Sequence, residues 1–195
     1  MINLNTVSAK AEDVCINMDA IIRKLNAEND ASVQALILES YNDLCSVANP
    51  RAAYVSSQIK ISGSIIDFGY MTLESSNLAA NLAGCGEAYV FVATLGVDVD
   101  RMIEKYSRVM QSKALVCDTV ASYMIEGFCD YLNGLLVPKE QSKPRFSPGY
   151  GDLSLLSQEK ILSCLDATKK IGVALTDSFM MVPSKSVSAI IGVKN

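Results

Sequence analysis

The order of its predicted elements places this chain in the α+β class, with a mixed or antiparallel twisted sheet and several helices. Apolar residues recur at helical spacing near the N-terminus and over residues 98–135, whereas β-branched or continuously apolar runs typical of strands occur between 52 and 70 and at 87–95. The two kinds of element do not alternate regularly, so a doubly wound parallel sheet fits less well. No internal repeat or low-complexity linker divides the 195 residues, and one domain over 1–195 is expected.

The N-terminal part, about residues 1–50, is predicted to be helical. Two helices are expected, over residues 8–26 and 31–48. The second has Ser32 as its candidate cap and ends before Pro50, which cannot continue a helix. One side of this helix carries its apolar residues: Val33, Leu36, Ile37, Tyr41, Leu44 and Cys45.

The middle of the chain is predicted to supply strands and one short helix. The β-branched residues between 52 and 70 indicate strands, and Ser75–Ser76 open a helix over 78–83. Residues 87–95 form a nearly continuous apolar run, which is typical of a strand buried on both faces.

The C-terminal half mixes helices, loops and strands. A helical region over 98–135 is unusually long for one globular helix, so a break near 111–113 is expected. The later elements are predicted in this order: an exposed loop over 138–144, a helix over 157–171, and strands over 173–175 and 187–193.

Composition excludes several classes of function. Hydrophobic residues make up 50% of the chain and charged residues 19%, which indicates a compact globule. The formal net charge is −4 and no Lys/Arg stripe is present, so nucleic acid is not expected as a partner. The N-terminal residues lack the pattern of an export signal, and no apolar run is long enough to span a bilayer. The expected location is the cytoplasm, without a membrane partner.

The cysteine and histidine content limits the chemistry further. Six cysteines are scattered without a CxxC pair and are predicted to be small buried hydrophobes. The chain has no histidine, which removes Ser-His-Asp and Cys-His nucleophilic machinery and the usual zinc ligand sets. Neither a catalytic residue nor a metal site is therefore predicted.

The turn that starts at Arg145 and continues through Ser147, Pro148, Gly149 and Tyr150 is the strongest candidate binding feature. An arginine presents five donors in a rigid fork, and a Pro-Gly turn holds it on stiff backbone, which suits a small anionic group such as a carboxylate.

Glu126 is the second candidate, because a carboxylate within an apolar helix needs a donor or a cation if it is buried. The alternative for both charged residues is structural. Glu126 would lie on a solvent-facing stripe with Asp118, Ser122 and Asp130, and Arg145 would flank a surface turn. Phe146 and Tyr150 would then be packing residues. Lys185, between two serines, is predicted to be solvated.

Four segments together resemble one known family. They are Glu126–Leu132 (EGFCDYL), Arg145–Tyr150 (RFSPGY, similar to the family's RPAPGY turn), Leu175–Met181 (LTDSFMM) and Pro183–Gly192 (PSKSVSAIIG). From about Glu87 onward the chain resembles the C-terminal activation domain of cobalamin-dependent methionine synthase. The resemblance implies an activation-domain-like fold over about residues 51–195.

The resemblance also implies a ligand, S-adenosylmethionine. Carried over by position, Arg145 would bind its methionine carboxylate, Glu126 a polar or cationic part, and the Ser147 backbone would approach the adenine. Gly149 and Tyr150 would complete the ligand-binding turn. The methyl group sits on a sulfonium, so its transfer needs positioning more than acid–base chemistry, which suits a chain without histidine.

In that family, the domain supports reductive remethylation of cobalamin. The Asp-x-His-x-x-Gly motif of cobalamin-binding domains is absent, so cobalamin is expected only through a partner. The implied partners are a cobalamin-binding methyltransferase, or a methionine synthase lacking its own activation domain, and an external electron donor such as a flavodoxin. The chain would then be a stand-alone reactivation component.

Two alternatives stay open. The first is a non-catalytic interaction module that keeps the fold and partner docking but does not bind S-adenosylmethionine. It is motivated by the family's upstream ligand-holding aspartate, which has no match in residues 1–50, and by a family tyrosine that would lie beyond Asn195. The second is a small-molecule enzyme with Glu126 or Asp152 as a base. It is disfavoured because no pair of carboxylates at helical spacing is expected near the turn.

Overall fold

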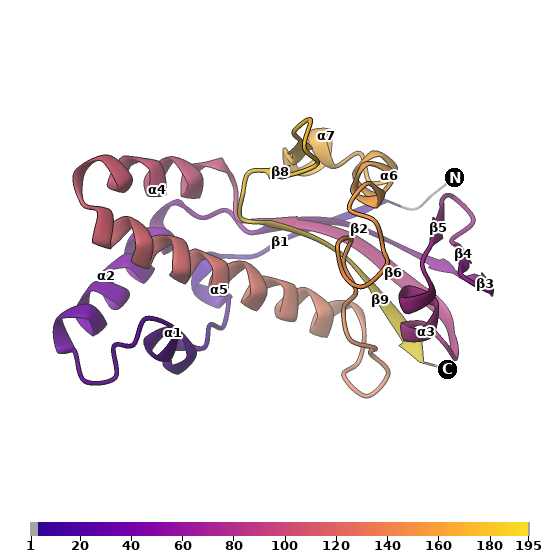
Figure 1. Cartoon of the computed structure of the whole chain (residues 1–195), viewed down its shortest axis with the longest axis horizontal. Helices are drawn as coiled ribbons and strands as arrows, with labels where there is room; N and C mark the ends of the chain where they lie inside the picture. The colour runs from indigo at the N-terminus through magenta and orange to yellow at the C-terminus, as the bar shows by residue number, and fades with distance from the viewer. Residues whose placement is uncertain (1–3, 195) are drawn as a thin grey trace.

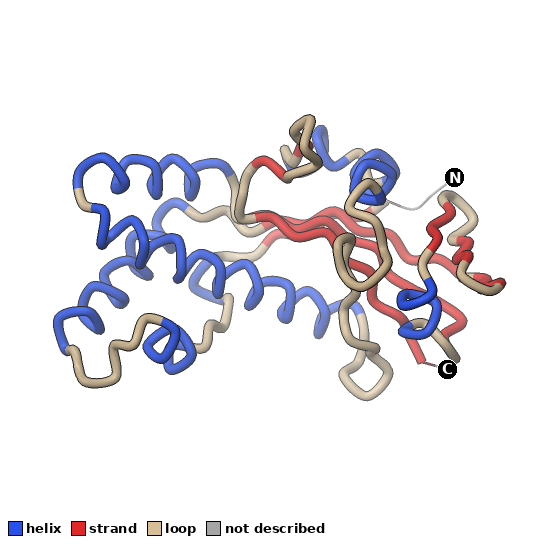
Figure 2. Tube along the Cα trace, viewed as in Figure 1, coloured by secondary structure: helices blue, strands red, loops and turns tan. Residues whose placement is uncertain are grey.

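The computed structural model describes residues 4–194, so both ends of the expected 1–195 span lie outside the described part. Helices and antiparallel sheets combine in it, and the predicted α+β class is confirmed (Figures 1 and 2). The helices are η1 (Ala11–Asp13, a 3-10 turn), α1 (Met18–Lys24), α2 (Ala31–Val47), α3 (Ser76–Asn81), α4 (Val97–Val109), α5 (Gln111–Leu136), α6 (Ser157–Cys164) and α7 (Ala167–Ile171).

A four-stranded antiparallel sheet forms the centre of the molecule. Its strands lie in the order β1 (Asn5–Ser8), β2 (Arg51–Gln58), β6 (Cys85–Thr94) and β9 (Ser186–Lys194). A three-stranded sheet of β3 (Lys60–Ser62), β4 (Ile65–Asp67) and β5 (Thr72–Glu74) lies at one end, and a short pair joins β7 (Ala174–Leu175) to β8 (Met181–Val182). The last strand, β9, is an edge strand of the main sheet.

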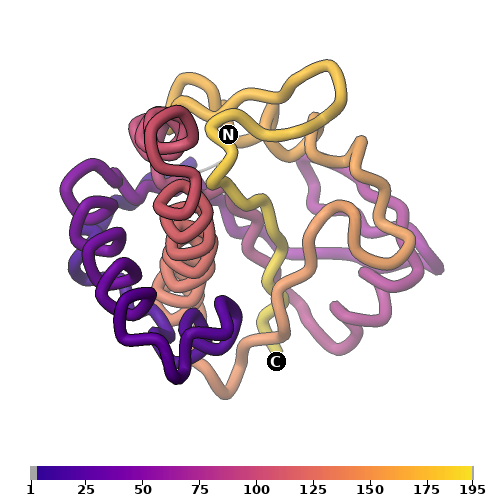
Figure 3. The backbone as a smooth tube through the Cα atoms, turned by 60° about the vertical axis from the view of Figure 1, so that its left-hand side comes forward, coloured from indigo at the N-terminus to yellow at the C-terminus, as the bar shows by residue number. Residues whose placement is uncertain are grey.

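Both faces of the main sheet are covered, and side chains on successive strand positions enter different cores. In β6, Phe91 and Ala93 pack with α2 and α5, whereas Val90 and Val92 pack on the side of α6 and α7. Figure 3 shows α5 running between the N-terminal helices and the sheet. The prediction that this strand is buried on both faces is confirmed, although its neighbours are antiparallel.

The predicted helix over 8–26 is wrong. That stretch contains the end of β1, then η1, and only α1 is α-helical. The segment of β1 pairs with residues 51–54 of β2, so the N-terminal part contributes a strand to the sheet as well as helices. A partner strand 43 to 49 residues further along the chain (Ser8 pairs with Arg51 and Asn5 with Tyr54) stabilises this extended segment, and local periodicity does not reveal such pairing. The second predicted helix is present as α2, but its cap is Asp30, whose carboxylate accepts from Ser32 and Val33.

The long helical region breaks at Met110, close to the expected position, and gives α4 and α5. The predicted helix over 157–171 is instead two helices, α6 and α7. Asp166 between them adopts a left-handed backbone conformation (φ 47°), which interrupts helical geometry. Of the six cysteines, Cys117 and Cys129 are buried as predicted, whereas Cys15 is exposed. No helix within residues 4–194 has the length and apolar character needed to cross a bilayer.

Lys113, near the start of α5, ties three helices together. Its ammonium lies 2.6 Å from Glu39 and 2.7 Å from Asp43 of α2, and 4.5 Å from the ring centroid of Tyr106 in α4. The Tyr106 hydroxyl in turn donates to Asp43. Bonding to Lys113 lowers the pKa of the Asp43 carboxyl, and bonding to Asp43 and Glu39 raises the pKa of Lys113.

We expect Lys113→Met to lower the free energy of unfolding by about 1–2 kcal/mol, because two carboxylates lose their cation. The Asp43 contribution is lost as acid protonates that carboxyl, and the Lys113 contribution is lost as base deprotonates the ammonium. The difference from wild type should therefore be largest between roughly pH 5 and 9 and should shrink on both sides. Urea unfolding within this pH range and on both sides of it measures the difference, with exposed Lys24→Met as the matched control.

Candidate functional site

One face of α5 carries polar residues at a spacing of four: Asp118, Ser122, Glu126 and Asp130. The stripe predicted as the structural alternative therefore exists. It does not face solvent alone, because two cations approach it from the edge of the sheet formed by β9 and the segments beside that strand. Glu126 is 58% exposed, as the stripe predicts, and its carboxylate is also paired with Arg145.

Arg145 is the cation at the centre of the site. Its Nη1 donates to Asp130 at 2.6 Å and its Nη2 to Glu126 at 3.0 Å, and its side chain is only 22% exposed. Burial works to lower the Arg145 pKa. The bond to Asp130 and the nearby negative charges outweigh this effect and raise the pKa. The guanidinium is therefore permanently charged and aimed at α5.

The backbone beside Arg145 is held by β9. Phe146 and Ile190 exchange N–H···O bonds of 2.9 Å in both directions, and Lys143 donates to Gly192. The segment thus lies antiparallel along the outer edge of β9, joined to it by isolated bridges at Ser142 and Phe146. This pairing, more than the Pro-Gly turn alone, places the arginine opposite the helix.

The following turn is anchored on α3. Asp152 accepts from the Ser75 hydroxyl and from the backbone N–H groups of Ser76 and Asn77. Because the hydroxyl bond to Ser75 and these backbone bonds outweigh desolvation, they lower the pKa of the Asp152 carboxyl. A carboxylate of lowered pKa is a weak base, so Asp152 is better explained as a helix cap than as a catalytic base.

Lys185 is the second cation, and the prediction that it is solvated is wrong. Its side chain is 12% exposed, and its Nζ lies 2.8 Å from Asp118 and 2.9 Å from the Ser122 hydroxyl. It fastens the start of β9 to α5, two helical turns from the Glu126 pair. No local pattern indicated this contact, because the two elements are 63 residues apart.

Two adjoining hollows open along this seam. The larger, about 450 Å³, is lined by charged groups and by the turn: Glu126, Asp130, Asn133, Lys139, Ser142, Lys143, Pro144, Arg145, Ser147, Tyr150 and Val187. The smaller, about 160 Å³, is lined by Glu126, Ser147, Pro148, Tyr150, Gln158, Met181, Ser186, Val187 and Ser188. Four residues line both, so the two hollows are parts of one groove.

Four of the five predicted ligand residues line the larger hollow: Glu126, Arg145, Ser147 and Tyr150. Gly149 lines neither hollow. With φ at +91° it shapes the turn. Sequence reasoning missed Asp130 and Gln158 as site residues. The statement that no carboxylate pair at helical spacing lies near the turn is also wrong, since Glu126 and Asp130, four residues apart, both contact Arg145. That spacing was the available signal for Asp130, whereas nothing local indicated Gln158.

The arrangement suits binding and positioning more than bond cleavage. Carboxylates and guanidinium at one hollow can hold the ammonium and the carboxylate of a zwitterion. The nearest thiol is a poor nucleophile, because burial raises the pKa of Cys129 to about 12.

Fold and site together define an α+β domain with a charged groove between a long helix and a sheet edge. The sequence profile of the family "Vitamin B12 dependent methionine synthase, activation domain" matches residues 83–195. This chain belongs to that family, as the motifs at Glu126 and Arg145 indicated.

A solved structure supports the same fold over nearly the whole chain. The crystal structure of the MetH reactivation domain bound to AdoHcy matches with a TM-score of 0.77 and 17% sequence identity. The match covers 98% of this chain and 78% of that chain, so it includes the N-terminal residues that the family profile does not reach. A search of curated proteins finds no match.

Proposed function

We propose that this protein binds S-adenosylmethionine and presents its methyl group for the reductive remethylation of cobalamin held by a separate protein in the cytoplasm. Membership of the activation domain family supports a reactivation role. The likeness to a reactivation domain that binds AdoHcy supports the class of ligand.

The observation that carries the proposal is the meeting of Glu126 and Arg145 at the larger hollow. The ligand's amino-acid end has a carboxylate for the arginine and an ammonium for Glu126 and Asp130. Arg145 uses two of its N–H groups on the two carboxylates, which leaves other donors of the fork for the ligand. The sulfonium would lie near the same negative charges.

The partner we propose is a cobalamin-binding methyltransferase or a methionine synthase without its own activation domain. This chain has no histidine to ligate cobalt. The electron would come from an external donor such as a flavodoxin. In this scheme the protein contributes position: it holds the methyl donor while the partner supplies the cobalt and the donor supplies the electron.

Calorimetric titration of the whole chain with S-adenosylmethionine, and with S-adenosylhomocysteine as the stable analogue, tests the binding half. We expect saturable one-to-one binding of both. The reactivation half is tested by mixing the cobalamin-loaded partner with reductant and S-adenosylmethionine. We expect methylcobalamin to form only when this protein is also present, and the absorbance of the cofactor measures its formation. No heat at millimolar ligand removes the proposal that this chain binds the methyl donor.

A second candidate is an interaction module without ligand. The ion pairs of Arg145 favour it if their role is structural, since Arg145 already pairs with two carboxylates and fastens the turn to α5. In that case the Glu126→Gln/Arg145→Ala double variant would still be retained by the cobalamin-loaded partner in a pull-down, and titration with either ligand would give no heat.

A further inference from the structure

The two walls of the groove come from elements that are far apart in the chain. One wall is α5, which contributes Glu126 and Asp130. The other is the edge of the sheet, where Val187 of β9 lines both hollows and the serines on either side of it line the smaller one. The separation of the walls sets the width that a ligand can fill, so contacts that join them bear on binding as well as on stability.

Polar contacts join the two walls at three levels within residues 4–194. Arg145 joins them in the middle, and near the C-terminal end of α5 the Asn133 amide donates to the Ser142 hydroxyl at 3.0 Å. These residues line the larger hollow, so a ligand there competes for their polar groups. At the other end, Lys185 bonds two side chains of α5. Lys185 and its two partners line neither hollow, so a ligand does not compete for this contact.

Three consecutive residues fix the start of β9 on three different elements. Ser184 donates from its backbone N–H and from its hydroxyl to Asp100 of α4, both at 2.7 Å. The buried Ser186 hydroxyl lies 2.8 Å from Oγ1 of Thr94 in β6. Lys185, between them, is the residue of the three that reaches the opposite wall of the groove.

We infer that Lys185 is a positioning residue that sets the width of the groove at this end, an inference that rests on the proposed function. Its ammonium lies 2.8 Å from the Asp118 carboxylate and 2.9 Å from the Ser122 hydroxyl, one helical turn before Glu126. Val187, two residues after Lys185, contributes to both hollows. The contact therefore fixes the distance between the β9 wall and the Glu126 carboxylate without touching the ligand.

Loss of this contact acts on binding through order, since no contact to the ligand is removed. Without the ammonium, the start of β9 keeps its bonds to α4 and β6 but is no longer fastened to α5. A bound ligand then has to hold both walls in place, and this ordering costs binding free energy. Because encounter with the open groove is unchanged, the effect should appear mainly in the dissociation rate.

The test compares binding of S-adenosylhomocysteine by the wild-type chain, Lys185→Met and Asp118→Asn. Affinity should fall about tenfold in Lys185→Met, mostly through faster dissociation measured by stopped flow. The loss should be smaller in Asp118→Asn, because the Ser122 hydroxyl still accepts from the lysine. The double variant should bind no more weakly than Lys185→Met alone, because both changes remove the same contact.

Lys113→Met is the matched control, because it removes another buried lysine that ties α5 to a neighbouring helix and lines neither hollow. This control should lose stability and keep wild-type affinity. Lys185→Arg keeps the positive charge and should recover part of the affinity that Lys185→Met loses. Asp118 is 52% exposed, so Asp118→Asn tests the contact even if Lys185→Met does not fold.

The outcomes separate the two claims. Wild-type affinity and dissociation rate in folded Lys185→Met, or in Asp118→Asn if the first variant does not fold, overturn the positioning role and leave the proposed function standing. An equal loss of affinity in Lys113→Met also overturns it, because the effect would then follow from lower stability alone. A wild-type chain that does not bind S-adenosylhomocysteine removes the proposed function, and this inference with it.

Discussion

Arg145→Ala is expected to weaken binding of S-adenosylhomocysteine by roughly ten- to a hundredfold, because a charge-assisted pair with a carboxylate contributes about 1.5–3 kcal/mol. The variant also leaves Glu126 and Asp130 without their shared cation, so the turn loses its tie to α5. Both effects act in the same direction. Calorimetry measures the affinity, and circular dichroism checks that the fold is retained.

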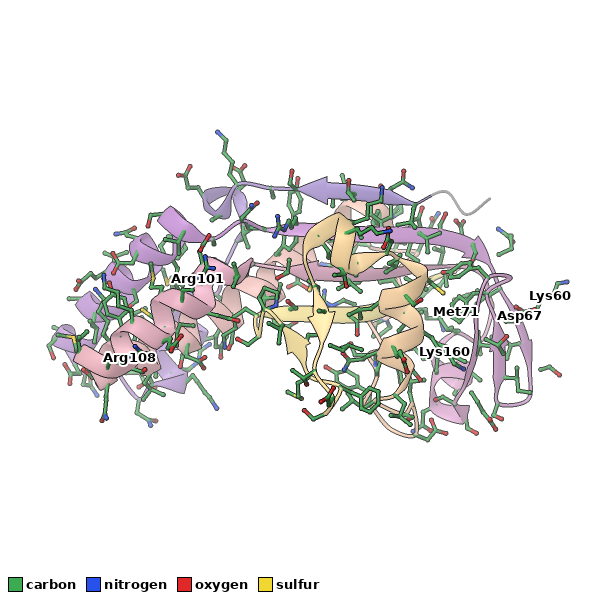
Figure 4. The ribbon with its side chains drawn as sticks, turned by 90° about the horizontal axis from the view of Figure 1, so that it is seen from above. Lys60, Asp67, Met71, Arg101, Arg108 and Lys160 are labelled. Carbon is green, nitrogen blue, oxygen red and sulfur yellow. The ribbon has the colours of Figure 1, made fainter. Side chains whose placement is uncertain are left out.

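Two further variants separate charge from geometry. Arg145→Lys keeps the charge but not the fork and should bind with intermediate affinity. Arg108→Ala removes an exposed arginine of α4 (labelled in Figure 4) that pairs with Glu104 and lines neither hollow, and the variant should bind like wild type. An Arg145→Ala protein that is folded and binds with unchanged affinity would show that the arginine is only a structural tie.

Gly127→Ala is expected to lower the free energy of unfolding by about 2–3 kcal/mol, near the upper end of the usual cost of overpacking a core. A Cβ at this position would lie 2.2 Å from the backbone oxygen of Cys15 and 3.2 Å from a Val14 methyl. Neither the helix nor the segment before α1 can accommodate it without moving. Because Gly127 adjoins Glu126, we also expect weaker ligand binding.

Gly134→Ala is the matched control in the same helix. An added Cβ there meets nothing within 4 Å, so better helix propensity should raise stability by about 0.5–1 kcal/mol. Urea unfolding of both variants gives the comparison. Equal stability of the two would contradict the close approach of the N-terminal segment to α5.

Several elements of the fold were predictable because their signals are local. Periodicity within the stretch predicts the apolar strand β6 and the amphipathic helix α2, and the length of the helical region predicts the break between α4 and α5. One error falls where pairing with a distant residue decides: the β1 segment is a strand because β2 lies beside it. The other is local, because the left-handed backbone of Asp166 interrupts a helix that periodicity alone would continue.

The residues of the candidate site also divide into those with a local sequence signal and those without one. Glu126 and Arg145 could be singled out from an unusual carboxylate and a rigid turn, and the resemblance of their motifs to a family placed them together. Lys185 was predicted to be solvated and is not, whereas Asp130 is exposed as the structural alternative expected, and only its pairing with Arg145 was missed. A charged residue in a helical stripe looks the same in sequence whether or not a cation reaches it. Gln158 had no signal at all, since burial of an amide depends on what packs around it.

The sequence by itself therefore determined the class, the family and the two charged residues around which the groove is built. The tertiary structure alone decided that Arg145 meets two carboxylates at once, that Lys185 ties β9 to α5, and that Gln158 lines the same groove. The physical reason is the separation along the chain over which each kind of interaction acts. Helical and strand periodicity and turn chemistry act between near neighbours in the chain. Ion pairing, burial and hollows arise where the edge of the sheet and the long helix, far apart in sequence, come together.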